Sequence, residues 1–237
     1  MKKSVYTKLL VILVIMISVG IGFFLTPYIM KKQILPENKY ETIALPAPSY
    51  ESSTSVEEAL LKRRSVREFD DEPLALSQVS QLLWAAQGTT DPSGKRTAPS
   101  AGALYPLEIY VVVGNVSGLS SGIYKYKPAK HELLKISDGD IRKQLSSASL
   151  GQASIKDGAI TIVMAGVYER TTSKYGDRGI RYVHMEAGHA AQNIYLQAES
   201  LGLGTVVTGA FDDAHVERLL NLQKDEEPLY LIPVGKK

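Results

Sequence analysis

The sequence predicts an α+β domain in which helices flank a central mixed or antiparallel sheet, preceded by one N-terminal transmembrane helix. Helical and strand patterns are interspersed without the regular strand–helix–strand repeat of a doubly wound parallel sheet, which favours α+β. Two apolar runs, 107–113 and 159–166, are typical of central strands buried on both faces. Residues 9–30, a run without a single charge, predict the membrane-spanning helix.

At about 1.5 Å per residue, the run 9–30 reaches roughly 33 Å, enough to cross a hydrocarbon core. A cleaved signal peptide is the alternative, but the run is longer than a usual signal-peptide core and no small-x-small cleavage site follows it. We therefore expect residues 1–32 to be an uncleaved single-pass membrane anchor. Three lysines before the run weakly favour an exported domain, and two lysines after it oppose this, so the side of the membrane stays open.

The composition excludes several classes of function. The absence of cysteine excludes disulfides, thiolate metal sites, iron–sulfur clusters and a cysteine nucleophile. Five of the 27 basic residues and none of the 25 acidic residues lie in 1–32, which leaves residues 33–237 with a net charge of −3. A domain with this balance has no broad basic surface, so we expect no nucleic-acid partner.

The part after the anchor divides into a linker and one domain. Residues 33–54 contain three prolines and a run of serines and threonine, which predicts a linker. The domain, residues 55–237, opens with the capping box Ser55-x-x-Glu58, and a helix then leads to a run of arginines. Ser77 is expected to cap a second helix that ends at Gly88.

The rest of the domain alternates in type without a fixed order. Residues 89–106 form a loop too long for a simple connection, and long ordered loops in compact domains are usually functional. Apolar patterns predict strands at 107–113, 123–127, 133–136, 159–166, 205–208 and 229–234, and helices at 140–148, 179–201 and 212–220.

The first candidate site is the basic segment Arg63, Arg64, Ser65 and Arg67. Guanidinium groups are planar, permanently charged forks that suit a phosphate. If the helix continues, Arg63 and Arg67 share one of its faces. The alternative is a solvated basic helix end, which the helix dipole also favours.

The second candidate is the loop stretch from Pro99 to Pro106. Its small residues Ser100, Ala101 and Gly102 would let backbone amides approach a flat ligand, while the prolines stiffen the walls. A plain surface loop is the alternative.

Glycines near the C-terminus need separate interpretations. Gly202-x-Gly204 leaves a helix and enters a strand, the reverse of the order in a dinucleotide-binding fingerprint, so Gly202 is better explained as a helix C-cap. Gly209, at a strand end, can present a backbone N–H to a ligand.

Two polar constellations remain. Lys174 and Tyr175 can act as a proton donor–acceptor pair in a partly desolvated site, or they can belong to a polar loop before a helix. Glu186 and His189 have the spacing of a di-metal carboxylate motif, but no matching carboxylates accompany them. We expect satisfied polar groups at a helix or subunit contact there, and no metal.

Taken together, four stretches resemble the nitroreductase superfamily of FMN-dependent oxidoreductases, and within it the SagB-type dehydrogenases, which include azoline oxidases. They are RRSVREF at 63–69, PSAGALYPLEIYVVV at 99–113, KYGDRGIRYVHMEAGHAAQNIYLQAESLGLG at 174–204, and the ending VVTGAFDD with LIPVGK.

The resemblance implies a nitroreductase-like fold working as a homodimer, with two FMN sites at the subunit interface. By position, it implies that Arg63, Ser65, Arg67 and Lys236 hold the phosphate, ribityl chain and pyrimidine edge, with Arg64 nearby. It assigns the isoalloxazine walls to Pro99, Ser100, Ala101 and Gly102, and an N–H near flavin N5 to Gly209. Lys174 and Tyr175 fall where azoline oxidases have a catalytic pair, and Ala103 stands where classical nitroreductases have an asparagine.

The expected function is therefore a membrane-anchored FMN oxidoreductase that transfers a hydride between flavin N5 and a small-molecule or peptide substrate. An NAD(P)H-dependent reductase of nitro compounds or quinones is the alternative, with NAD(P)H as electron donor. A non-catalytic scaffold that keeps the fold is a third hypothesis.

Overall fold

The computed structural model describes residues 41–237. The expected anchor, 1–32, and the first part of the expected linker lie outside the described residues. Among residues 41–237, no helix has the length and apolar character needed to cross a bilayer.

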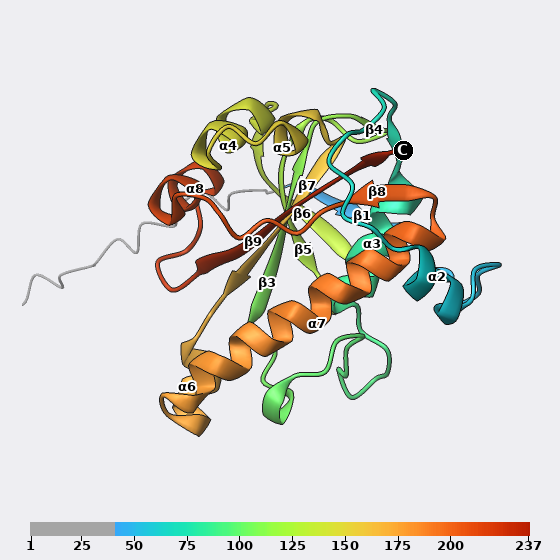
Figure 1. The fold of residues 1–237 in the computed structure, drawn as a ribbon. Helices are drawn as coiled ribbons and strands as arrows, with labels where there is room; N and C mark the ends of the chain where they lie inside the picture. Colours follow the sequence, from blue (N-terminus) through green and yellow to red (C-terminus); the bar gives the residue numbers. More distant parts are fainter. Residues whose placement is uncertain (1–40) are drawn as a thin grey trace, which may run out of the picture. The chain divides into compact units, whose positions relative to one another are not determined.

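A seven-stranded sheet with the order β1-β6-β5-β3-β7-β9-β8 is the centre of the domain (Figure 1). Each neighbouring pair in this sheet is antiparallel, so the α+β prediction is confirmed in its antiparallel form. Its strands are β1 (Thr42–Ala44), β3 (Leu107–Val113), β5 (Gly122–Lys127), β6 (Glu132–Asp138), β7 (Ile160–Gly166), β8 (Leu203–Thr205) and β9 (Glu227–Lys236). The short strands β2 (Leu74–Ala75) and β4 (Val116–Ser117) form a separate parallel pair.

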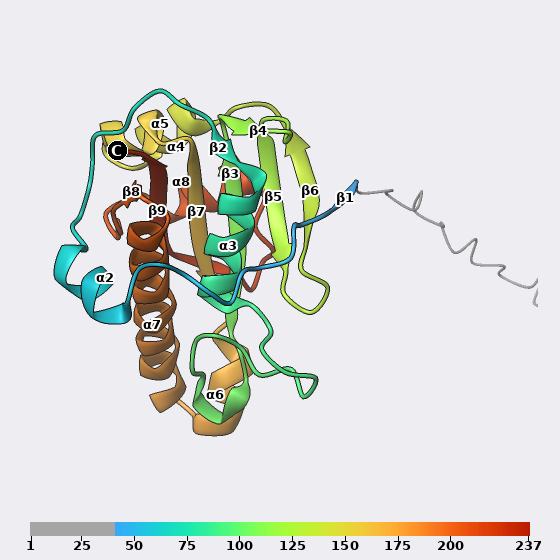
Figure 2. The same cartoon turned by 90° about the vertical axis from the view of Figure 1, so that its right-hand side faces the viewer.

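Helices cover both faces of the sheet (Figures 1 and 2). They are α2 (Val56–Lys62), α3 (Leu76–Gln87), α4 (Arg142–Ala148), α5 (Ala153–Asp157), α6 (Glu169–Tyr175), α7 (Arg178–Ser200) and α8 (Asp213–Leu220), with the 3₁₀ turn η1 at Ala101–Ala103. Alternate residues of β3 enter two different cores: Ile109 and Val111 lie with α3 and α7, whereas Tyr110 and Val112 lie with α4, α5 and α8. This is why β3 reads as a continuous apolar run.

Several expected boundaries were wrong. α2 ends at Lys62, with Arg63 as its C-cap in a non-helical conformation, so Arg63 and Arg67 do not share a helical face. The N-cap of α3 is Ala75 rather than Ser77. The strand expected at 205–208 lies at 203–205 instead, and Thr208 makes only an isolated bridge to Leu231.

The short elements β1, β2, β4, α5, α6 and η1 were not predicted from the sequence. Residues 42–44, in the expected linker, form β1, whose Ile43 pairs with Leu133 of β6. The following stretch also packs on the domain, since Leu45 is buried and Ser49 exchanges two hydrogen bonds with the Gln81 side chain. The segment before α7 forms α6, so Lys174 and Tyr175 lie at the end of a helix and not in a loop.

Candidate functional site

The basic segment is docked on the edge of the sheet formed by β8 and β9. Val66 N–H donates to the Thr205 carbonyl at 2.9 Å, and Asp70 N–H donates to the Lys236 carbonyl at 3.1 Å. Gly204 and Gly235 make this docking possible. A Cβ on Gly204 would lie 2.7 Å from a Val66 methyl carbon, and one on Gly235 would lie 2.7 Å from Phe69.

Tyr195 of α7 organises the polar side of this segment. Its hydroxyl lies 3.0 Å from the Ser65 hydroxyl and accepts a hydrogen bond from Val207 N–H at 2.9 Å. The Arg63 guanidinium lies over the Tyr195 ring, 5.0 Å from its centroid, which is a cation–π contact. Sequence reasoning missed Tyr195, because one tyrosine on a long amphipathic helix carries no signal of its own.

The remaining expected phosphate ligands differ in where they lie. Arg64 turns back on its own chain and donates to the carbonyls of Leu61 and Arg63, so in this conformation it caps α2. Arg67 is exposed and makes no ion pair within the described part of the chain. Lys236 pairs with Leu203 at the end of β9, beside the same docked segment. Arg63, Ser65 and Lys236 therefore belong to one edge.

The loop Pro99–Pro106 has an unusual backbone. Gly102, Ala103 and Tyr105 have φ angles of 63°, 53° and 47°, in the left-handed region that non-glycine residues rarely adopt. Ser100 holds the loop together, since its carbonyl accepts from Ala103 N–H and its hydroxyl accepts from Tyr105 N–H at 2.9 Å. A strained loop with several fixed contacts is typical of a functional site.

The structure brings Lys174 and Tyr175 to this loop. A Cβ on Gly102 would lie 2.8 Å from the Tyr175 hydroxyl and 3.0 Å from Lys174 Nζ. Tyr175 also packs edge-on against Tyr182, with ring centroids 5.2 Å apart. Two stretches more than 70 positions apart in the sequence thus meet, and glycine at 102 is needed for their close approach.

A series of hydrogen-bonded side chains links Arg96, just before the loop, to the buried Glu186 of α7. Arg96 donates to the side-chain oxygen of Gln87 at 3.1 Å, and Gln87 donates to Glu186 Oε1 at 3.3 Å. Within residues 41–237, the other oxygen of Glu186 is buried and has no hydrogen-bond partner. Burial raises the pKa of Glu186, an effect that Ser100, Gln87 and Arg96 oppose. The expectation of satisfied polar groups on α7 is therefore only half met, because Glu186 keeps one unpaired oxygen.

Three other polar residues of α7, close to Glu186 in the sequence, have no ligand-like arrangement. His189 and Gln192 are exposed, and Asn193 donates to the Ala85 carbonyl. Residues 41–237 contain no group of three His, Asp or Glu side chains placed to hold a metal.

Gly202 and Gly209, the two glycines near the C-terminal strands, differ in their backbone conformation and surroundings. Gly202 has a φ of 68° just after α7, as a helix-ending glycine does. Gly209 is exposed, and a Cβ there would meet only Tyr230, at 3.8 Å. Its backbone is open to a ligand.

The expected site residues thus form two groups, one near each end of α7. Arg63 and Ser65 contact Tyr195 toward the C-terminal end of α7, and Lys236 lies on β9 beside the same docked segment. Gly102 approaches Lys174 and Tyr175 of α6, the helix at the other end of α7 (Figure 1). At about 1.5 Å per residue, Tyr195 lies roughly 25 Å along the helix from its first residue, Arg178. Within a single chain, the two groups of residues are therefore far apart.

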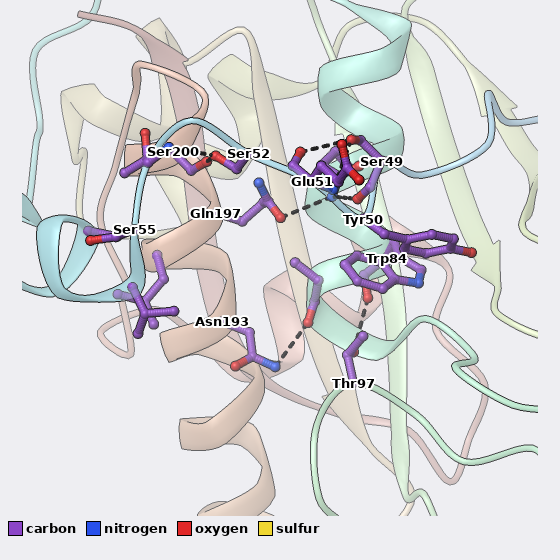
Figure 3. Close-up of a pocket in the computed structure, with 16 residues that line it drawn as sticks. Ser49, Tyr50, Glu51, Ser52, Ser55, Trp84, Thr97, Asn193, Gln197 and Ser200 are labelled. Atoms are coloured by element: carbon purple, nitrogen blue, oxygen red, sulfur yellow. Dashed lines mark hydrogen bonds between the residues drawn. The ribbon is translucent and has the colours of Figure 1, made fainter.

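A pocket of about 360 Å³ lies elsewhere, between the stretch 49–56, α3 and α7 (Figure 3). Tyr50 and Trp84 form one wall with ring centroids 5.5 Å apart, and Asn193 and Gln197 form the other. None of the expected site residues lines this pocket, so this hollow does not mark the candidate chemistry.

Comparison with known proteins gives a consistent result. The family model described as "Nitroreductase family" matches residues 60–236. A Methanocaldococcus jannaschii protein named "Putative nitroreductase MJ1384" is 50% identical over 197 residues, covering 83% of this chain and 98% of that protein. A crystal structure of a Ralstonia eutropha protein, named in the same way, has a TM-score of 0.72 at 31% identity and covers 82% of this chain and 89% of that one.

A more distant relative has a different name. The microcin B17-processing protein McbC of Escherichia coli is 30% identical over 167 residues, covering 68% of this chain. The match spans 61% of the length of McbC. The family match and the antiparallel fold agree with the resemblance noted in the sequence. The chain therefore belongs to the nitroreductase family of flavin-dependent oxidoreductases.

Proposed function

We propose that this protein is an FMN-dependent oxidoreductase of the SagB type, transferring a hydride between flavin N5 and an organic substrate. The observation that carries the proposal is the approach of Lys174 Nζ and the Tyr175 hydroxyl to Gly102. It places a candidate acid–base pair on the loop whose small residues suit the flat face of a flavin. In this proposal FMN supplies the hydride chemistry.

The residues at the edge of β8 and β9 fit the anionic tail of FMN. Arg63 and Ser65 are held by Tyr195, and Lys236 adds a second cation at the same edge. Arg67, exposed and without an ion pair in the described chain, would place positive charge by the pyrimidine and stabilise its reduced anion. Gly209 would donate its N–H toward N5 from an open backbone.

A homodimer would join the two groups of residues. The outer face of α7 exposes Met185, with a relative exposure of 51%, and Gly188 has open space around it; Ile180, near the start of the helix, is 44% exposed. If two copies of α7 packed antiparallel near Gly188, the N-terminal end of one would lie beside the C-terminal end of the other. Lys174 and Tyr175 of one protomer would then approach Arg63 of its partner. This arrangement explains why one chain holds the groups apart.

In that site Lys174 or Tyr175 would move the proton that accompanies hydride transfer. Lys174 must be neutral to accept a proton, whereas Tyr175 can donate one through its hydroxyl. Pro99, Ser100 and Ala101 would position the ring, and the hydrogen bonds of Ser100 within the loop keep that surface in place. The McbC relative, named for processing of microcin B17, supports a peptide substrate.

The alternative is an NAD(P)H-dependent reductase of nitro compounds or quinones. The nitroreductase name of the relative with 50% identity favours it. Rapid bleaching of bound flavin by NADH or NADPH would select the reductase, and failure of both to reduce the flavin would select the dehydrogenase. We also propose that residues 1–32 anchor the protein in a membrane, with a weak preference for an exported domain.

The decisive experiment is FMN uptake by the purified full chain in detergent. We expect a yellow protein, with affinity lowered at least about tenfold in Arg63→Ala, because a charge-assisted phosphate contact contributes roughly 1.5–3 kcal/mol. Arg218→Ala, which removes an exposed arginine on α8, is the control and should bind FMN normally. A colourless preparation that takes up no added FMN would refute the proposal and favour a non-catalytic scaffold.

A further inference from the structure

Arg170 of α6 makes two bonds that point to different parts of the domain. One guanidinium nitrogen donates to the Tyr105 carbonyl at 3.1 Å, and another donates to Glu108 Oε1 at 2.5 Å. Tyr105 belongs to the Pro99–Pro106 loop and Glu108 to β3. Arg170 therefore joins α6 to both the loop and the sheet.

On the loop side, Arg170 bonds to Tyr105, a residue with a strained backbone. Tyr105 keeps a φ of 47° while its hydroxyl accepts from Arg96 N–H at 3.2 Å and the Arg96 guanidinium lies 4.5 Å from its ring centroid. Its own N–H donates to the Ser100 hydroxyl. With the Arg170 bond, both backbone groups of Tyr105 and its side chain are held, which is how a strained conformation persists.

On the sheet side, Arg170 belongs to a network of four charged side chains, with Glu108, Lys125 and Glu226. Glu108 shares its carboxylate between Arg170 and Lys125, whose Nζ lies 3.0 Å from Oε2, and Lys125 also pairs with Glu226. Two cations and two carboxylates balance, and Lys125 and Glu226 are almost fully buried. Burial raises the pKa of Glu108, but Lys125 and Arg170 together outweigh it, so that its pKa is lowered. The anchor for Arg170 is therefore a fixed, ionised carboxylate.

We propose that Arg170 is a positioning residue that sets where Lys174 and Tyr175 lie over Gly102. This inference rests on the proposed role of that pair. Arg170 and Lys174 are one turn apart on α6, a helix of only seven residues, so a fixed Arg170 fixes the end of the helix. A lysine at position 170 would keep the charge but lacks the rigid fork that donates in two directions.

The chain supplies a matched control for this fork. Arg142 of α4 likewise donates to a backbone carbonyl, that of Gly158 at 2.8 Å, and to a carboxylate, Asp140 at 2.7 Å. It contacts neither the loop nor α6 in these bonds. Arg142→Lys therefore measures the general effect of losing an arginine that donates two hydrogen bonds. Any additional effect of Arg170→Lys comes from the contacts that Arg170 makes to the loop and to β3.

The experiment places a fluorine-labelled tyrosine at position 175 of the full chain and records its ¹⁹F spectrum. The Gly102→Ala variant supplies the reference for a displaced Tyr175, since its Cβ would overlap the hydroxyl. We expect Arg170→Lys to shift or split the signal, with faster amide exchange across 170–176, while Arg142→Lys leaves both unchanged. In the FMN-loaded protein, Arg170→Lys should lower kcat about 10- to 100-fold with little change in KM, the scale of a misplaced catalytic group.

An unchanged ¹⁹F signal and unchanged exchange in Arg170→Lys would overturn the proposal. Equal changes in Arg170→Lys and Arg142→Lys would do the same, because they would show a general loss of stability. The spectrum is measured without cofactor, so it still tests the position of Tyr175 if FMN does not bind. If Lys174→Ala and Tyr175→Phe keep full turnover, the proposed acid–base role of the pair fails while the positioning result stands.

Discussion

Replacing Lys125 by methionine should destabilise the domain by about 3 kcal/mol, because it leaves buried carboxylate charge without its cation. The Lys125 side chain is 6% exposed, and its Nζ lies between Glu108 and Glu226, whose side chains are 17% and 2% exposed. Methionine keeps the apolar stem and removes the charge. The four-charge group then carries a net charge of −1 inside the protein.

The magnitude follows from what remains around the carboxylates. Removing one partner of a buried ion pair typically costs about 3–5 kcal/mol. Glu226 keeps hydrogen bonds from the Tyr110 hydroxyl at 2.5 Å and from Gln223 N–H at 3.0 Å, and Glu108 keeps Arg170. These contacts place the expected loss at the lower end of the range. For a domain of this size, a loss of 3 kcal/mol lowers Tm by about 6 to 12 °C.

Urea unfolding of four proteins measures this effect. They are the wild type, Lys125→Met, Glu226→Gln and the double variant, which removes one charge of each sign and should recover at least half of the loss. Lys135→Met is the control, because Lys135 pairs with the exposed Asp138 and Glu41, and such surface pairs contribute about 0–1 kcal/mol. Equal losses in Lys125→Met and Lys135→Met, or no recovery in the double variant, would refute the reasoning.

Three further predictions follow from single contacts. Gly204→Ala would bring a Cβ 2.7 Å from Val66 and push the basic segment off β8, so FMN titration should show weaker uptake; unchanged affinity would contradict this. Tyr195→Phe removes the hydroxyl that bonds Ser65, and the same titration should show about tenfold weaker binding, since a hydrogen bond contributes roughly 1 kcal/mol and more when charge is involved. Burial lowers the pKa of His131 below its ordinary value of 6.5, so the neutral imidazole stabilises the folded state. This contribution to the free energy of unfolding is fully present above pH 6.5 and is lost as the pH falls below it. His131→Asn should flatten that part of a profile of Tm against pH.

The fold was largely predictable because its central elements have strong local patterns. The expected bounds of β3, 107–113, match the structure, and both ends of β7 and of α7 lie within one residue of the expected bounds. A strand buried on both faces and a long amphipathic helix leave clear signals. β1 and α6 leave none, because β1 has three residues at a sheet edge and α6 has only Thr171 buried.

The sequence indicated which stretches contribute to the candidate site, but it did not predict how these stretches contact one another. The arginines were expected at the end of a helix with a turn near Ser65, but the backbone bonds that dock their segment on β8 and β9 left no signal in the sequence. Arg170 and Tyr105 were missed because their importance comes from a contact across 65 positions, which no local pattern records. Gly102 was singled out as a small residue, but the groups it accommodates are known only from the structure.

The length of α7 gives a physical reason for a site built from two copies. A helix of 23 residues is too long to bring Tyr195 and α6 to one place within a chain, at about 1.5 Å per residue. The same helix exposes Met185 on the side away from its buried residues, a face without a partner inside the described domain. An antiparallel pair of such helices would bury that face and bring the separated groups together, so under the proposed function dimerisation and completion of the flavin site are one event. A monomeric preparation that binds FMN with full affinity would break this link.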